Sequence, residues 1–183
     1  MKLLIAAALL FGGADDGWVT WRVEAGEDLG YWCCATWSAG RATPASCQLD
    51  GGGLNINNDN PTIRSTGEMQ IYVKLEDGKA KRIRALSPQC PIETEESIKD
   101  LGLIATDESL DWLSEQVGDD RRASSDALLA ISAHESPRAV EMLVRAIENR
   151  DLRKKVREEA LFWLVTSGSD EAYEYLDRLL SSR

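Results

Sequence analysis

The segment SDALLAISAHESPRAVEMLVRAI, residues 125–147, aligns with EEALFWLVTSGSDEAYEYLDRLL, residues 158–180, at a constant offset of 33 and without a gap. Small and apolar residues coincide along both segments, and the turn coincides as well, with Ser136 over Ser169. Apolar residues three and four apart indicate helices, so each segment predicts two helices joined by a turn. Self-similarity at a fixed period is typical of stacked repeats. The C-terminal part is therefore predicted to be a stack of helix pairs.

Local signals for helix ends agree with this prediction. Ser136 is followed by Pro137, which is the pattern of an N-cap with proline at the first helical position. Gly168 followed by Ser and Asp indicates the end of one helix and the cap of the next. Asp151 is predicted to cap the first helix of the second pair.

A weaker copy of the repeat lies earlier in the chain. The matching apolar positions, at an offset of 30, are Leu110 with Val140, Leu113 with Leu143, and Val117 with Ile147. The preceding segment, residues 95–105, lacks a helical stripe, so this copy is expected to be a single helix. The two ends of such a short stack would expose apolar surface, so each end needs another element to cover it. We expect the N-terminal half to cover one end, and residues 179–183 to cap the other unless a partner does.

The C-terminal half resembles the HEAT-repeat superfamily. Residues 156–164, VREEALFWL, followed by Gly168 and then Asp-Glu-Ala at 170–172, are similar to the repeat form of bacterial HEAT proteins. That form has Arg, Ala and Trp-Leu at fixed spacing, then a turn and a second helix. The resemblance covers about 75 residues and implies a short α-solenoid that binds another protein. The family has no agreed catalytic residues to assign here.

The N-terminal half is predicted to be rich in β-structure. In residues 18–23, WVTWRV, and 69–74, MQIYVK, apolar residues alternate with the other residues, which is typical of half-buried strands. A second strand, residues 82–86, follows the sequence Glu76-Asp77-Gly78, so the two strands are predicted to form a hairpin. A three-residue loop at 76–78 would place Ile71 opposite Ile83 and keep one face apolar, so we prefer it to a two-residue turn.

The N-terminus resembles a short secretory signal. Met1-Lys2 precede an apolar run at 3–11, and small residues then lead to Ala14, after which cleavage is predicted. At nine residues the run is too short to cross a bilayer. The alternative is a buried N-terminal strand or helix. Residues 1–14 are therefore assigned to a signal peptide, and the mature protein to the periplasm or the exterior, with no membrane span.

The four cysteines, Cys33, Cys34, Cys47 and Cys90, fit an oxidising compartment. The adjacent pair is not expected to bond to itself, because the small ring would strain the peptide. Two pairings remain open: Cys33–Cys47 with Cys34–Cys90, or Cys33–Cys90 with Cys34–Cys47. A zinc site is the alternative use of four cysteines, but their spacing lacks the paired Cys-x2–4-Cys pattern. Cys-x-x-Cys, the redox pattern, is also absent.

The cysteine-bearing half also resembles a known leader domain. Trp32-Cys33-Cys34, residues 46–49 (SCQL), and above all residues 87–90 (SPQC) after the hairpin are similar to the leader domain of exported bacterial HEAT-repeat proteins of uncharacterised function. Such proteins are encoded near extracytoplasmic-function sigma factors. The resemblance therefore implies a role in envelope signalling or stress regulation.

Charge and composition exclude several functions. The formal net charge of −10 argues against nucleic acid and anionic lipid as partners. The one histidine, His134, is placed in a turn and expected to be solvated or capping, so a histidine-dependent active site is not predicted. Residues 48–61 are rich in Gly, Asn and Asp, but their spacing does not match known calcium loops. No catalytic residue, cofactor or metal is predicted, and the protein is not expected to be an enzyme.

These observations predict an α+β protein, with a disulfide-containing β-rich domain at residues 15–103 and a short HEAT-like solenoid at 104–183. The predicted function is an exported protein–protein interaction or scaffold module. Alternatives are a metal- or redox-responsive sensor that uses the cysteines, and an accessory subunit of an envelope enzyme complex. The identity of the partner and the oligomeric state stay open. The second helix of each pair lines the inner surface of such a stack, so the predicted partner-binding residues are Arg138, Glu141, Arg145, Glu174, Asp177 and Arg178.

Overall fold

The computed structural model describes residues 16–25, 32–39, 41–51, 56–57, 67–118, 120–134 and 136–181. Within them the chain is an α+β protein in which strands precede helices, as predicted. The predicted signal peptide lies outside these residues. In chain order the elements are β1 (Gly17–Glu24), β2 (Cys33–Ser38), β3 (Arg41–Pro44), β4 (Cys47–Gln48), β5 (Ile56–Asn57), β6 (Glu68–Glu76), β7 (Lys79–Leu86), β8 (Ile92–Glu93), β9 (Ile98–Leu103), α2 (Thr106–Glu115), α3 (Arg121–Ser132), α4 (Pro137–Glu148), α5 (Lys154–Ser167) and α6 (Asp170–Ser181).

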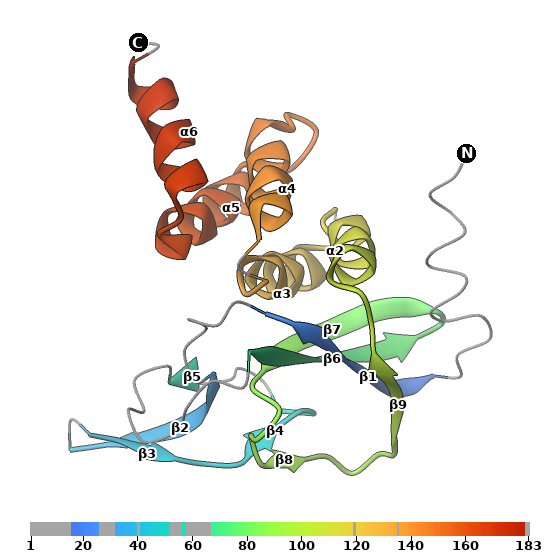
Figure 1. Cartoon of the computed structure of the whole chain (residues 1–183). Helices are drawn as coiled ribbons and strands as arrows, with labels where there is room; N and C mark the ends of the chain where they lie inside the picture. The colour runs from blue at the N-terminus through green and yellow to red at the C-terminus, as the bar shows by residue number, and fades with distance from the viewer. Residues whose placement is uncertain are drawn as a thin grey trace.

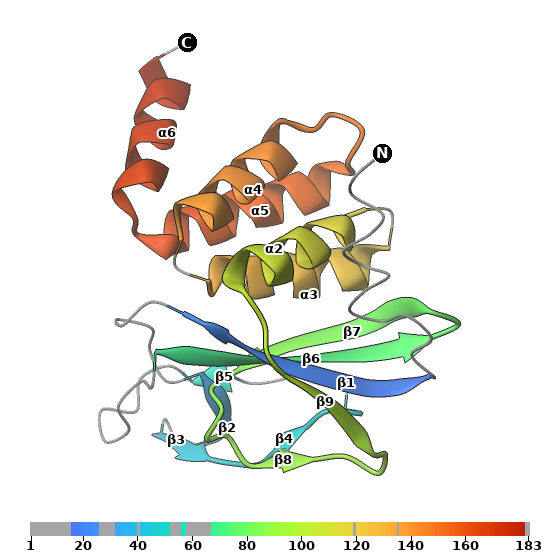
Figure 2. The same ribbon diagram turned by 45° about the vertical axis from the view of Figure 1, so that its right-hand side comes forward.

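The elements form three layers, with a four-stranded sheet in the middle (Figure 2). Its strand order is β7-β6-β1-β9, with β1 antiparallel to β6 and parallel to β9. Helices α2 to α5 lie over one face, and the short strands β2, β3, β4, β5 and β8 lie beyond the other. The alternation predicted for the first strand is confirmed: Val19, Trp21 and Val23 belong to the core that includes the helices, whereas Trp18 belongs to a second core.

The β6–β7 hairpin turns through two residues, so the predicted three-residue loop is wrong. Glu76 pairs with Lys79. Asp77 and Gly78 between them have positive φ angles of 52° and 68°, which is the backbone of a type I′ turn. This turn follows the twist of the flanking strands, and Asp and Gly both tolerate the left-handed conformation.

A β-bulge restores the apolar face that the two-residue turn alone would lose. Lys74 pairs with Arg82 and the next residue of β6 pairs with Ala80, so β7 has one extra residue, Lys81. Beyond this bulge Val73 lies opposite Ile83, and both side chains are buried in the main core. The apolar face was predicted correctly, but the register was not, since an extra residue in one strand cannot be read from alternation.

One continuous core joins the sheet to the helices. It runs from Trp21 and Ile71 in the sheet through Leu110 and Leu128 to Leu164 in α5. The strand half ends with β9 at Leu103 and the helical half begins with α2 at Thr106. The main core runs through both halves, and the second core lies within the strand half alone. The sheet covers the first end of the helix stack.

Polar contacts fix the sheet to α3. The Asp126 carboxylate accepts hydrogen bonds from the Ile83 backbone N–H (3.1 Å) and from Arg84 Nη1 (3.2 Å). Burial raises the pKa of Asp126 and lowers that of Arg84, while their mutual attraction opposes both shifts. A carboxylate beside a buried guanidinium is costly to remove, so this pair fixes where α3 lies on β7.

Helix ends mostly follow the sequence signals. Ser136 caps α4 by accepting from the Ala139 N–H, with Pro137 at the first position, and Gly168 ends α5 with a φ of 64°. The predicted cap at Asp151 is wrong, because α5 begins after Arg153 without a side-chain cap. Residues 98–103 form β9, so the weak earlier repeat contributes α2 alone.

Helices α2 to α5 pack against one another. Helix α2 lies against α3 and α4, α5 also lies against α3 and α4, and α6 touches α4 and α5 (Figure 1). Helix α6 projects away from the sheet at the far end of the stack, which is also where the C-terminus lies. Only Ala172 and Tyr175 of α6 are buried.

Candidate functional site

A groove of about 320 Å³ between α2 and α4 is the candidate site. Apolar side chains line its floor, among them Ile131 from α3 and Met142 and Ala146 from α4. The polar residues that line it are Asp111, Ser114, Arg138, Arg145 and Asn149. An apolar groove with a few polar groups at its margin fits a side chain or a short segment of another protein.

Two arginines of α4 stand at the margin of the groove. Arg138 reaches α2, where Nη1 lies 3.3 Å from Asp107 Oδ2 and the second nitrogen contacts Asp111. Arg145 pairs with Glu141 one turn away on the same helix. Their side chains are 39% and 70% exposed, so solvent weakens these ion pairs and the guanidinium groups can exchange them for a carboxylate on a partner.

The six predicted partner-binding residues fall into two groups. Arg138 and Arg145 line the groove, and Glu141 is bonded to Arg145. Glu174, Asp177 and Arg178 are exposed on α6 and are not among the residues that line the groove. The two groups are set apart because α6 leaves the stack, a divergence that the alignment of repeats could not predict.

A polar contact links α6 to α4. Tyr175 of α6 donates a hydrogen bond to the Glu148 carboxylate at the end of α4. Burial raises the pKa of Tyr175, and the nearby Glu148 raises it further. This contact holds the first half of α6 against α4.

A second hollow, of about 360 Å³, lies between α4 and the turn from α5 to α6. It is lined by four serines, but their hydroxyls serve helix ends. Ser132 and Ser167 donate to carbonyls three residues back, while Ser136 and Ser169 accept from backbone N–H groups. Because these hydroxyls already form hydrogen bonds with backbone groups at helix ends, we interpret the hollow as a feature of helix packing and not as a binding site.

His134 is buried, so the prediction of a solvated side chain is wrong, although its capping role is right. Nδ1 lies 2.6 Å from the Ala130 carbonyl oxygen, which can only accept, so Nδ1 carries the proton. Nε2 then accepts from Ser109 Oγ (3.1 Å), which in turn accepts from Trp21 Nε1 (3.0 Å). Burial lowers the pKa of His134 to about 4. The chain of hydrogen bonds ties β1, α2 and α3 together and serves stability.

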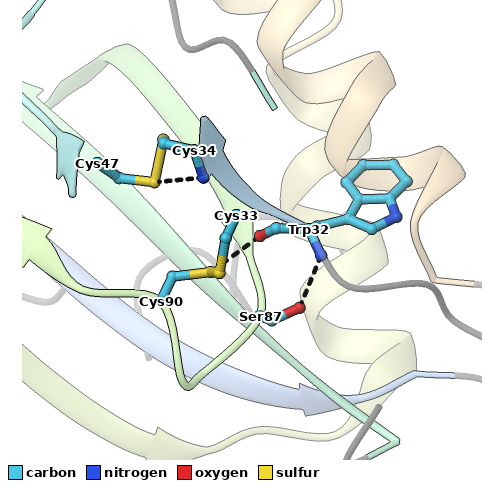
Figure 3. The surroundings of a disulfide bond; sticks show 6 residues. All are labelled: Trp32, Cys33, Cys34, Cys47, Ser87 and Cys90. Carbon is cyan, nitrogen blue, oxygen red and sulfur yellow. Dashed lines mark hydrogen bonds between the residues drawn. A yellow bond between two sulfur atoms is a disulfide. The ribbon is translucent and has the colours of Figure 1, made fainter. Parts of the chain in front are cut away.

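The cysteines form Cys33–Cys90 and Cys34–Cys47, which decides between the two open pairings (Figure 3). All four are buried in the second core, on the face of the sheet away from the helices. The adjacent cysteines start β2 and point to different partners, as the alternation of an extended strand requires. Cys34–Cys47 fixes β2 to β4, and Cys33–Cys90 fixes it to the loop after β7.

The backbone beside the disulfides is held by further bonds. Trp32 N donates to Ser87 Oγ and Ser87 N donates to the Trp32 carbonyl, each at 2.9 Å. The sulfur of Cys90 lies 3.0 Å from the same carbonyl oxygen (Figure 3). Residues 32 and 87 are therefore held together next to the Cys33–Cys90 disulfide.

Asp50, the described carboxylate of the Asn-rich loop, also has a structural role. It accepts from Trp18 Nε1 at 2.8 Å and from Thr94 Oγ1 at 2.7 Å. The bond from Trp18 is the main reason why its pKa is lowered. The loop residues Asn55, Asn58 and Asp59 lie outside the described residues. In the described part of the chain, no group of three or more His, Cys, Asp or Glu side chains is arranged to hold a metal.

Helices long and apolar enough to cross a bilayer do not occur among the described residues. Comparisons with protein-family models, with curated proteins and with solved structures each found no match.

Proposed function

We propose that this protein is an exported protein–protein interaction module and that the α2–α4 groove binds its partner. The observation that carries the proposal is the groove itself, where an apolar floor at Met142 lies between Arg138 and Arg145. Aromatic, Met and Arg side chains are enriched in protein interfaces. An acidic segment with one apolar residue would satisfy both arginines and fill the floor.

A short HEAT-like solenoid, with α2, α4 and α6 on its inner surface, is part of this proposal. The 33-residue repeat and the succession of helix pairs support it. Two buried disulfides fit a periplasmic or secreted protein, because such bonds persist in oxidising compartments. A role in envelope signalling or stress regulation rests on the resemblance of the strand half to the leader domain. If the protein is instead an accessory subunit of an enzyme complex, it would bind that complex through the same groove.

A sensor that uses the four cysteines has less support. Zinc binding and thiol chemistry both need thiolates, and the sulfurs of Cys33, Cys34, Cys47 and Cys90 are bonded to each other in pairs. They are also buried, with at most 6% of each residue exposed. The groove is open to solvent, whereas the disulfides are not.

The double variant Arg138→Ala/Arg145→Ala is expected to lose at least about 10-fold in affinity for the partner, since each lost charge-assisted contact costs about 1 kcal/mol or more. The measurement is affinity capture from the envelope fraction, followed by titration of the captured protein. The matched control is Glu174→Ala/Arg178→Ala on α6, outside the groove. Equal binding by both variants would exclude the groove, and loss only in the α6 variant would move the site to α6.

A further inference from the structure

Positive charge gathers at one end of the molecule. Figure 2 shows the β6–β7 turn, the α2–α3 turn and the α4–α5 turn together at its right-hand end. The segments at these turns, residues 79–82, 116–122 and 149–155, hold nine Lys and Arg against three Asp. The whole chain has 21 Lys and Arg against 31 Asp and Glu, so the charge of this end is opposite to that of the protein.

The start of β7 lies next to the start of α3. The carboxylate of Asp120 caps α3, and the hydrogen bond from the Ala123 N–H is the main reason why its pKa is lowered. The nearby charges of Lys81 and Arg122 lower this pKa as well. Lys81, the extra residue of the β7 bulge, therefore shares one surface with the first turn of α3.

The start of α5 lies on the same surface. Val117 of the α2–α3 turn and Leu152 of the α4–α5 turn line the same groove, so the two turns face each other across its end. Ser125 of α3 donates a hydrogen bond to Glu159 of α5. Both residues lie about one turn after the start of their helix, so the first turns of α3 and α5 are side by side.

Six cations of this end form no ion pair with another residue of the described part of the chain. All of them are exposed or half-buried. We call them the basic end, and they are Lys81, Arg121, Arg122, Arg150, Arg153 and Lys155. Their charges are therefore open to a partner, whereas Arg22, Lys74 and Arg138 already pair with carboxylates of this chain.

Helix stability does not explain these cations. Arg121 and Arg122 are the first two residues of α3, and Arg153 and Lys155 lie at the start of α5. Neither helix has an acidic residue in its first turn, and α5 has no side-chain cap. Because the N-terminus of a helix carries partial positive charge, cations at this position lower its stability. A negatively charged partner would offset this cost.

The chemistry of the basic end fits protein carboxylates. Four of its six residues are Arg, whose guanidinium group binds a carboxylate through two parallel hydrogen bonds. Binding to a membrane surface also requires apolar side chains that enter the lipid. Within the described ranges, the large apolar side chains that are exposed all lie outside the three segments, at Leu103, Phe162, Val165, Tyr173, Leu179 and Leu180.

We propose that the basic end binds an acidic segment of a partner protein. The segment would lie across the starts of α3 and α5 and reach Lys81 on β7. This surface consists of other residues than the arginines of the α2–α4 groove, so each proposal stands or fails without the other.

Fluorescence anisotropy of a labelled oligoglutamate peptide, titrated with the purified, disulfide-bonded chain, tests the proposal. The peptide should bind at low ionic strength, and binding should weaken as salt is added, because salt screens exposed charges. Arg121→Glu/Arg153→Glu should raise the dissociation constant at least about 10-fold, since like charges then face the peptide. The matched control is Arg41→Glu/Lys99→Glu, which makes the same change in net charge at exposed positions of β3 and β9 and should bind like the wild type.

The double variant should unfold at the same temperature as the wild type or a higher one, because a carboxylate at a helix start is favourable. If it does not fold, Arg150→Glu in the α4–α5 turn replaces it and should weaken binding at least about 3-fold. The proposal would be overturned by a wild type that does not bind the peptide at low ionic strength. A folded double variant that binds as tightly as the wild type, or an equal loss in the control, would overturn it too.

Two further measurements separate the basic end from other sites. Sedimentation with phosphatidylglycerol vesicles tests an anionic membrane as the partner, and a wild type that binds the vesicles but not the peptide would contradict the proposal. Loss of peptide binding in Arg138→Ala/Arg145→Ala alone would assign the acidic segment to the groove and would also contradict it. Loss in Arg121→Glu/Arg153→Glu with binding kept in the groove variant is the expected result.

Discussion

Replacement of Cys33 and Cys90 together by Ala is expected to lower the free energy of unfolding by about 4 kcal/mol. The bond closes a loop with a sequence separation of 57 residues, which restricts the unfolded chain strongly. It also ties β2, on the outer layer, to the loop that follows β7. The measurement is urea unfolding at equilibrium, followed by circular dichroism and tryptophan fluorescence.

The second disulfide is the control for the first. Cys34→Ala/Cys47→Ala opens a loop with a separation of only 13 residues, so its loss should cost about 3 kcal/mol, about 1 kcal/mol less than the loss of Cys33–Cys90. All four cysteines are buried, so the cavities left by the two double variants are similar. A larger loss for the Cys34–Cys47 variant would show that loop closure does not decide the difference.

Acidification from pH 6.5 to about 4 is expected to destabilise the protein by about 3 kcal/mol through His134 alone. Burial lowers the pKa of this histidine to about 4 in the folded protein, whereas in the unfolded chain it titrates near its ordinary value of about 6.5. The unfolded chain therefore binds the extra proton first. The stability is fully present above pH 6.5 and is lost progressively as the pH falls toward 4.

The variant His134→Gln separates this contribution from that of the carboxylates. Glutamine can still donate to the Ala130 carbonyl and accept from Ser109, but it does not titrate in this range. The free energy of unfolding should fall about 1.2 kcal/mol per pH unit more steeply in the wild type than in His134→Gln between pH 6 and 4.5. Parallel curves for the two proteins would contradict the buried, neutral state of the histidine.

The architecture was largely predictable because it depends on periodicity. Apolar spacing gave the strand at 18–23 and both helix pairs, and Ser136 and Gly168 gave helix ends. The predictions that were wrong depend on the local backbone and contacts of individual residues, which periodicity does not show. The bulge at Lys81 shifts the register without changing the alternation, and α5 begins without the cap that Asp151 would supply.

The candidate site was predicted in part. Exposure of the inner helices pointed to Arg138 and Arg145, but the role of α2 as the second wall of the groove was not foreseen, because α2 belongs to an incomplete repeat. His134 was misjudged because its repeat counterpart, Ser167, lies at an uncovered end of the stack, whereas the sheet and α2 cover His134. A position in a repeat has the same backbone in each copy, but its neighbours differ.

The most direct test of the interaction module is site-specific photo-crosslinking in the cells that make the protein. A photoreactive phenylalanine analogue replaces Asn149, which lines the groove beside the two arginines, and, as the control, the exposed Lys99 on β9. Illumination should join the Asn149 variant to one partner in a discrete heavier species that is absent from the Lys99 variant. No such species from Asn149, or the same species from both positions, would contradict a partner-binding groove between α2 and α4.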